Sequence, residues 1–481
     1  MSNTTYEQQL TEQTLKNKKV VEFIKVVSDL WFDQAIELVI FRNKLIDCKV
    51  SDIINLHQYA EEFVGKPITI DDTLAIAKAI SGAELPASRL DIGKLASEYI
   101  SEKDQFESVE AFVATKLEGS KNHKTIAPKD VVLYGFGRIG RLLARELATQ
   151  AGNGGQLRLR AVVTRDKMDA VLLEKRASLL RLDSVHGDFN GTVETDIENN
   201  ALIVNGVPVQ MISAAQPEDI DYTAYGIHDA LIIDNTGVFK DDVALARHLA
   251  AKGASRVLLT APGKGVPNIV YGVNHEEYDP KEVQIFSAAS CTTNAITPIL
   301  KVVEDHLGVV KGHLETIHAY TNDQNLVDNM HKKYRRGRAA ALNMVITETG
   351  AGSAVAKALP VLAGKLTSNA IRVPVPNGSL VVLNLEVEKN TSVEGLNEIM
   401  KNAALQGPLV EQIKYSLNNE LVSSDIVGTS APSIFDSNAT IVSADGKNVV
   451  MYVWYDNEYG YSHQVMRLAK YIAEVRRYTY Y

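Results

Sequence analysis

A run of glycines between an apolar strand and a helix constrains the fold of this chain more than any other feature. The β-rich segment 130–134 leads into the run, and the helix-forming residues RLLARELA follow it. The pattern GxGxxG between a strand and a helix predicts a tight turn whose backbone approaches a pyrophosphate at the helix N-terminus. The six residues of this expected dinucleotide-binding turn are Gly135, Phe136, Gly137, Arg138, Ile139 and Gly140.

Short β-rich runs alternate with helical stretches beyond this turn. The runs cover residues 159–164, 230–234, 256–260 and 284–286. Such alternation is typical of a Rossmann domain, an α/β fold with a doubly wound parallel sheet. From about residue 308 the strands lengthen, as in VPNGSLVVLNLEVEK, and predict an α+β domain with a mixed or antiparallel sheet.

The first 118 residues have a different pattern. They contain few glycines and prolines, and apolar residues such as Ile36, Val39 and Ile40 recur at helical spacing. We therefore expect an all-helical N-terminal extension. The predicted parts are the extension at 1–125, the dinucleotide-binding domain at 126–290, the catalytic domain at 291–457 and a C-terminal helix at 458–481 that packs back on the dinucleotide-binding domain.

Composition excludes several classes of protein. The chain has 481 residues, 45% hydrophobic and 23% charged, and no apolar run long enough to span a bilayer. The net charge is −9, of which residues 1–120 carry −7, and this argues against nucleic acid or an anionic membrane as partner. Two cysteines, Cys48 and Cys291, make a disulfide framework or clustered metal site unexpected, and with the polar N-terminus they favour the cytoplasm.

The cysteine at position 291 has the setting of a nucleophile. It lies in SAASCTTN, where a strand ends in small residues and a helix begins at or just after the cysteine. The positive end of a helix dipole lowers a thiol pKa. His318 follows in a strand-like segment, and a Cys–His pair can attack a carbonyl while the histidine moves the proton.

The strand after the glycine run leaves the choice of dinucleotide open. It ends in Thr164, Arg165 and Asp166. An acidic residue at this position binds the ribose 2′-hydroxyl of NAD, whereas an arginine accommodates the 2′-phosphate of NADP. The sequence offers both, so we expect NAD or NADP.

Residues 129–481 closely resemble the phosphorylating glyceraldehyde-3-phosphate dehydrogenases. The motifs that carry the resemblance include GFGRIGR, DSVHG, NTGVF, SAASCTTN, HAYTNDQ, AIRVPVPN and WYDNEYGYS. Residues 1–128 lie outside it. The resemblance implies that Cys291 attacks an aldehyde with His318 as base, that NAD(P) takes up the hydride, and that inorganic phosphate releases an acyl phosphate in glycolysis or gluconeogenesis. It also implies a homotetramer.

The resemblance assigns further residues. Those expected around the substrate phosphate and the attacking phosphate are Ser290, Thr292, Thr321, Arg336, Thr349, Gly350 and Arg372. Those expected around the cofactor, besides the glycine run and 165–166, are Thr236, Thr260, Asn457 and Tyr461.

Two alternatives remain open at this stage. One is an erythrose-4-phosphate dehydrogenase, which shares the scaffold but releases an acid. The other is a dehydrogenase scaffold whose helical extension serves regulation or assembly. We also predict that the extension mediates oligomer or partner contacts, which deletion of residues 1–120 would test.

Overall fold

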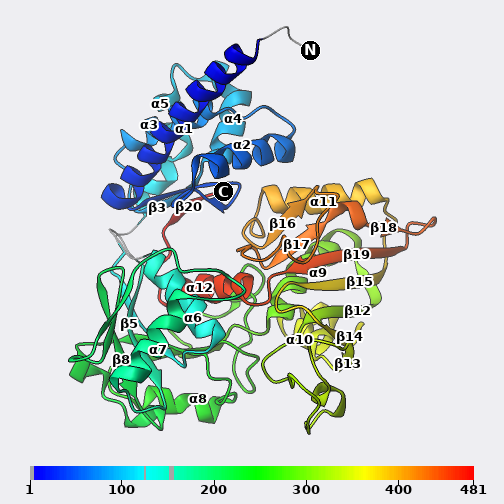
Figure 1. Cartoon of the computed structure of the whole chain (residues 1–481). Coiled ribbons are helices and arrows are strands. Elements are labelled where there is room, and N and C mark those ends of the chain that lie inside the picture. Colours follow the sequence, from blue (N-terminus) through cyan, green and yellow to red (C-terminus); the bar gives the residue numbers. More distant parts are fainter. Residues whose placement is uncertain (1–4, 124–125, 151–155) are drawn as a thin grey trace. The chain divides into compact units, whose positions relative to one another are not determined.

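The computed structural model describes residues 5–123, 126–150 and 156–481. They form two compact units (Figure 1). One contains the described residues up to Pro128, with Gln156 and Val475–Tyr481. The other contains Lys129–Gln150 and Leu157–Glu474. The C-terminal segment therefore belongs to the same unit as the N-terminal extension.

The extension is built mainly of helices, as expected, and it also contains a small sheet. Its elements are α1 Tyr6–Gln34, β1 Ile36–Ile40, β2 Asn43–Lys44, α2 Val50–Val64, α3 Ile70–Ser81, β3 Ser88–Asp91, α4 Ile92–Glu102 and α5 Val109–Lys116. The strand order is β2-β1-β3-β20. The helical prediction for Ile36–Ile40 is wrong: all five residues are buried, and a short, fully buried apolar run satisfies strand and helix patterns alike.

The end of the chain corrects a second prediction. Helix α12 covers only Tyr459–Ile472, and the last residues form β20, Tyr478–Tyr480. Strand β20 pairs in parallel with β3. Its neighbour Arg477 lies with its guanidinium carbon 5.1 Å from the centre of the Trp31 ring of α1. The helix predicted at 458–481 therefore ends at Ile472, because residues 478–480 pair as a strand in the sheet of the first unit.

The Rossmann sheet agrees with the strands expected from the sequence. Its elements are β4 Lys129–Tyr134, α6 Arg138–Thr149, β5 Leu157–Thr164, α7 Ala170–Arg181, β6 Val193–Asp196, β7 Ala201–Val204, β8 Val207–Ser213, β9 Ala230–Asp234, α8 Asp242–Leu249, β10 Ala254–Leu259 and β11 Ile285–Ser287. The order is β11-β10-β9-β4-β5-β8-β7-β6, and only the β6–β7 and β7–β8 pairs are antiparallel. Successive crossovers go to either side of β4, so a ligand crevice is expected at its carboxyl end.

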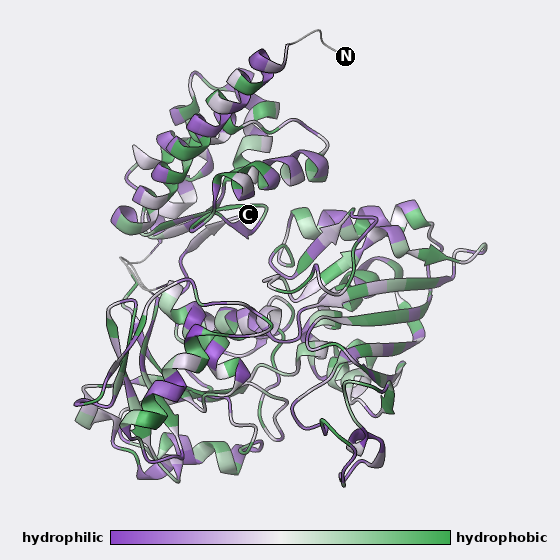
Figure 2. Cartoon of the chain, in the orientation of Figure 1, coloured by the Kyte–Doolittle hydropathy of each residue, from purple (hydrophilic) through white to green (hydrophobic). Residues whose placement is uncertain are grey.

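The second large sheet carries the remaining elements of this unit. They are α9 Cys291–Leu307, β12 Val309–Ala319, β13 Val345–Thr347, α10 Ala351–Ala358, β14 Leu366–Val373, β15 Ser379–Val387, α11 Val393–Leu405, β16 Ile413–Ser416, β17 Ser433–Asp436, β18 Ile441–Val442 and β19 Asn448–Tyr455. The order is β13-β14-β12-β15-β19-β17-β16, and β18 pairs with β19. In Figure 2 the long strands β15 and β19 are largely hydrophobic.

The register of this sheet gathers functional candidates at one end. His318 at the end of β12 is opposite Arg372 near the end of the parallel strand β14. Ser379 at the start of β15 is opposite Tyr455 at the end of the antiparallel strand β19.

No described helix is long and apolar enough to cross a membrane.

Candidate active site

Cys291 is the first residue of α9, as the sequence predicts. Ser290 caps the helix by accepting the Thr293 N–H at 3.0 Å. Ala289 has a φ of +54°, which a residue with a side chain rarely adopts, and its carbonyl accepts a 2.9 Å hydrogen bond from the Tyr461 hydroxyl. The turn before the thiol is therefore fixed from both sides. Tyr461, predicted beside the cofactor, has at least this structural role.

The histidine predicted as a base lies against the thiol. The distance from Cys291 Sγ to His318 Nε2 is 3.6 Å. On the other side of the ring, Nδ1 is 2.7 Å from the Ala319 carbonyl oxygen, which can only accept a hydrogen bond. Nδ1 protonated towards this carbonyl leaves Nε2 with a lone pair for the thiol proton.

Arg372 competes for the same ring nitrogen. Its Nη1 is 2.5 Å from His318 Nδ1 and donates to the Ala319 carbonyl at 2.8 Å. A guanidinium can only donate, so Nδ1 cannot serve both neighbours with one proton. The Arg372 Nε is buried without a hydrogen-bond partner among the described residues. This donor is available for an anion.

The electrostatics of the pair differ from the expectation of a lowered thiol pKa. Burial raises the pKa of Cys291, while the Arg372 cation and hydrogen bonds from Thr292 act in the opposite direction. Burial, and then the Arg372 cation, lowers the pKa of His318 to about 3. The desolvation of Cys291 thus raises its pKa by more than the first turn of α9 lowers it, and both groups are neutral at neutral pH.

Tyr455 is a residue that the sequence did not single out. Its hydroxyl is 2.9 Å from Thr292 Oγ1 and 2.9 Å from Thr316 Oγ1, and its ring packs edge-on against His318. The hydroxyl bonds tie the first turn of α9 to β12. The WYDNEYGYS motif contains this tyrosine, but only the sheet register brings it into contact with Thr292 and His318.

The other predicted phosphate residues lie on neighbouring loops. Arg336 donates from Nη1 to Asp323 at 2.5 Å and from Nε to Thr347 at 3.2 Å. Thr321 bonds to the same Asp323. Thr349 and Gly350 immediately precede α10, which begins at Ala351. The Thr292 hydroxyl is engaged by Tyr455, so any phosphate contact there involves a shared hydroxyl or the backbone.

The glycine turn fits a dinucleotide. Gly135 has a φ of +102°, and a Cβ on Gly140 would lie 2.5 Å from the Gly135 carbonyl oxygen, so both positions require glycine. A Cβ on Gly137 would meet no atom within 4 Å, which leaves open space beside the turn. No side chain caps α6 at Gly137. Its first N–H groups are therefore free for a phosphate.

The end of β5 carries both charges that bear on the choice of dinucleotide. Arg165 and Asp166 are exposed. Asp166 pairs with Arg176 of α7 at 2.5 Å. The Thr164 hydroxyl is buried without a hydrogen-bond partner among the described residues. The single carboxylate at this position is thus already neutralised by a cation.

Thr236 and Thr260, the predicted residues at the ends of β9 and β10, share one partner. The Thr236 hydroxyl donates to the Asp234 carboxylate at 2.7 Å, and the Thr260 hydroxyl donates to the Asp234 carbonyl at 3.0 Å. Asp234 is fully buried and is 2.9 Å from His248 Nε2. Both hydroxyl protons are used within the protein, so these threonines can offer a ligand only an acceptor or their backbone.

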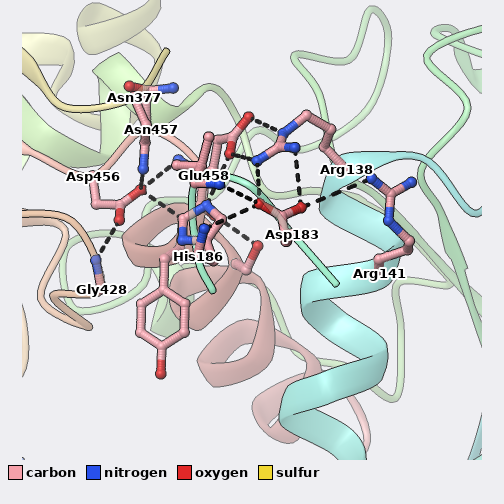
Figure 3. Close-up of polar contacts among 12 residues, drawn as sticks. Arg138, Arg141, Asp183, His186, Asn377, Gly428, Asp456, Asn457 and Glu458 are labelled. Carbon is pink, nitrogen blue, oxygen red and sulfur yellow. Dashed lines mark hydrogen bonds and ion pairs between the residues drawn. The ribbon is translucent and has the colours of Figure 1, made fainter. Parts of the chain in front are cut away.

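Arg138, predicted in the cofactor turn, binds two carboxylates (Figure 3). Its Nε and Nη2 each donate to Glu458 at 2.6 Å, and Nη1 and Nη2 donate to Asp183 at 3.1 and 3.2 Å. His186 Nε2 is 2.9 Å from Glu458. The Arg138 charge is therefore compensated, and its contribution at the turn comes from the backbone. Asn457, the remaining predicted cofactor residue, directly precedes Glu458.

Sequence comparisons place these features in a wider context. The profile described as glyceraldehyde 3-phosphate dehydrogenase, NAD binding domain, matches residues 129–242, and that of the C-terminal domain matches residues 290–457. Glyceraldehyde-3-phosphate dehydrogenase 2 of Nostoc is 43% identical over 72% of this chain and 98% of its own length. The enzyme of Geobacillus stearothermophilus is 42% identical over 71% and 98%.

One relative also matches beyond the dehydrogenase body. A glyceraldehyde-3-phosphate dehydrogenase-like protein of Pseudomonas aeruginosa is 48% identical over 94% of this chain and 98% of its own length. A match of this extent cannot be contained in residues 129–481. The N-terminal extension is therefore shared with this relative.

Proposed function

The chain belongs to the glyceraldehyde 3-phosphate dehydrogenase family, and on that premise we propose that it oxidises glyceraldehyde 3-phosphate with inorganic phosphate to 1,3-bisphosphoglycerate. The observation that carries the proposal is the Cys291–His318 pair, 3.6 Å apart, with Arg372 on the far side of the imidazole. The family membership establishes an oxidoreductase of this kind. The phosphorylating reaction and its place in glycolysis or gluconeogenesis are our proposals.

The first step is addition of Cys291 to the aldehyde. The sulfur forms a bond to the carbonyl carbon as His318 Nε2 takes the thiol proton. The imidazolium then gives this proton to the carbonyl oxygen, which completes a thiohemiacetal. Both groups are neutral before this step, and the low pKa of His318 makes its imidazolium a strong acid that passes the proton on to the carbonyl oxygen. The Cys291 N–H at the start of α9 and the protonated His318 stabilise the oxygen that gains charge.

The second half converts the bound aldehyde to an acyl phosphate. When bound, the nicotinamide accepts the hydride that leaves the thiohemiacetal carbon. His318 removes the hydroxyl proton, so that a thioester remains on Cys291. An inorganic phosphate oxygen attacks the thioester carbon, the carbon–sulfur bond breaks, and the protonated His318 returns its proton to the sulfur, which restores the thiol. We assign the attacking phosphate to Ser290, Thr292, Thr349, Gly350 and Arg336.

Arg372, with Thr321, is assigned to the phosphate of the substrate. Its partnerless, buried Nε supports this role, since a phosphate oxygen is the acceptor it lacks. A phosphate that draws the guanidinium away from His318 Nδ1 would leave Nδ1 to the Ala319 carbonyl and Nε2 to the thiol. Substrate binding and activation of the base would then be coupled.

The cofactor is a nicotinamide dinucleotide, and we propose that Arg165 permits use of NADP. The pairing of Asp166 with Arg176 supports this, because a neutralised carboxylate repels a 2′-phosphate less. Arg165→Ala should weaken NADP use and leave NAD use nearly unchanged. Inert NADP in both proteins, with equal NAD kinetics, would refute the role of Arg165.

The reaction itself is tested by nucleotide reduction with glyceraldehyde 3-phosphate. The purified protein receives NAD or NADP, with and without inorganic phosphate, beside Cys291→Ser. Phosphate-dependent reduction that is lost in the variant supports the proposal. Preferential oxidation of erythrose 4-phosphate, without need of inorganic phosphate, would assign the chain to the alternative dehydrogenase instead.

We further propose a cytoplasmic homotetramer in which the extension adds contacts. Exposed apolar side chains of the second unit support its assembly into oligomers. They belong to Leu326, Val327, Met330, Tyr334, Leu342 and Met344. On α1, Leu10, Val21 and Phe32 are each more than half exposed, and their spacing of 11 residues puts them on one side of the helix.

Light scattering tests the contribution of the extension. Replacement of Leu10, Val21 and Phe32 by lysine in the full chain should lower the measured mass or abolish partner capture. An unchanged mass and unchanged partners would count against it. Deletion of residues 1–120 is a poorer test, because it removes β3 and leaves β20 without its neighbour.

A further inference from the structure

A line of hydrogen bonds connects the strand of the candidate base with Asn457, which the family resemblance places beside the nicotinamide amide. The Ala319 N–H, next to His318, donates to Ser379 Oγ at 3.1 Å. Ser379 Oγ donates in turn to Asn457 Oδ1 at 2.8 Å. Ser379 is fully buried and Asn457 is 8% exposed. Two loops far apart in the sequence thus meet at one serine hydroxyl.

Proton accounting determines which way the Asn457 amide faces. Ser379 Oγ has one proton to donate, and it already accepts the Ala319 N–H. If Asn457 Nδ2 faced the serine, Ser379 Oγ would accept a second hydrogen bond. The Ser379 hydroxyl could then no longer donate to Asn457. The bonded arrangement puts Oδ1 against the serine and leaves Nδ2, which has no acceptor among the described residues, as a free donor.

The backbone on both sides of Asn457 is also fixed (Figure 3). Asp456 accepts from Asn377 Nδ2 and from the Gly428 N–H, both at 2.8 Å. Glu458 is bound through two hydrogen bonds to Arg138, the first residue of α6. Asn457 therefore cannot shift towards or away from a ligand without breaking one of these anchors.

We propose that Ser379 is a positioning residue that turns the Asn457 side-chain nitrogen towards the carboxamide oxygen of the nicotinamide. The inference rests on the proposed dinucleotide function. The Ser379 hydroxyl in β15 thereby sets the orientation of the Asn457 amide that contacts the cofactor. The same serine holds the backbone next to His318, so the nicotinamide and the base are placed by one group.

The test compares two ligands that differ in the nicotinamide. NAD or NADP, whichever the protein binds, is titrated beside ADP-ribose or its 2′-phosphate, which lack the ring. Ser379→Ala should weaken dinucleotide binding about tenfold, the worth of one hydrogen bond to a buried group, and leave binding of the ring-free ligand unchanged. A general loss of structure would weaken both ligands alike and overturn the proposal, as would no change in either.

Matched variants separate positioning from folding. Ser437→Ala removes another buried serine hydroxyl, which donates to the Ser416 carbonyl at 2.6 Å, and should change neither affinity. Asn457→Asp keeps the acceptor for Ser379 but replaces the free donor by an acceptor, so it should weaken the dinucleotide alone. Ser379→Ala in an Asn457→Ala background should have no further effect.

A second loss in that background would overturn the role of the serine. If the wild-type protein binds neither the dinucleotide nor its ring-free counterpart, the proposed function fails as well. If it binds both and Ser379→Ala does not distinguish them, only this inference fails.

Discussion

Truncation after Glu474 tests whether the C-terminal segment is part of the first unit. The deletion removes β20, in which three residues pair with β3, and the buried Val475 and Arg477. Loss of the pairing should cost about 3 kcal/mol, and loss of the buried valine about 2 kcal/mol. The sum of about 5 kcal/mol compares with a free energy of unfolding of about 5–15 kcal/mol for a whole domain.

Differential scanning calorimetry and limited proteolysis measure the effect. The transition of the first unit should shift to lower temperature or vanish, and cleavage should appear within residues 5–123, while the dehydrogenase unit keeps its transition. The control is Thr479→Ala, whose exposed side chain should change the stability by less than about 0.5 kcal/mol. Added peptide VRRYTYY should restore protection. An unchanged first transition in the truncated chain would refute the reasoning.

Other predictions concern the active site and the glycine turn. Burial raises the pKa of Cys291, so the rate of alkylation by iodoacetamide without substrate should rise with pH, with a midpoint above the ordinary thiol pKa of 9.0. Arg372→Gln removes a cation that lowers this pKa and should move the midpoint higher. A midpoint near neutral pH would contradict a raised thiol pKa. Gly140→Ala should abolish dinucleotide binding and lower the melting temperature, because its Cβ would lie 2.5 Å from the Gly135 carbonyl oxygen. Gly137→Ala should weaken binding alone, because its Cβ would meet no protein atom within 4 Å. Equal melting temperatures for the two variants would refute this distinction.

Local patterns sufficed where function depends on neighbours in the sequence. The strand–glycine–helix unit around Gly135 appears as β4 and α6, and the helix start at Cys291 is where SAASCTTN predicts it. Both depend on backbone conformations that a few consecutive residues dictate. The alternation of strands and helices likewise predicts the parallel sheet, because each strand must be covered by the helix that follows it.

Patterns failed where a segment's partner lies far away in the chain. Residues 36–40 form a strand because β3 lies beside them, and residues 478–480 form one because β3 has a free edge. Neither segment contains any sign of this partner. The thiol pKa was likewise misjudged, since desolvation depends on everything packed around Cys291 and not on the helix that it begins.

The sequence by itself determined the family and the glycine turn and pointed to Cys291 as the candidate nucleophile, because each depends on a short run of residues with a fixed local geometry. Only the tertiary structure decided which groups surround them. It brought Arg372 to His318, Tyr455 to Thr292 and Ser379 to Asn457, since these contacts arise from the register of strands that are distant in the chain. It also joined the N-terminal extension and the C-terminal segment in one unit, because a sheet edge accepts any strand whose backbone donors and acceptors match.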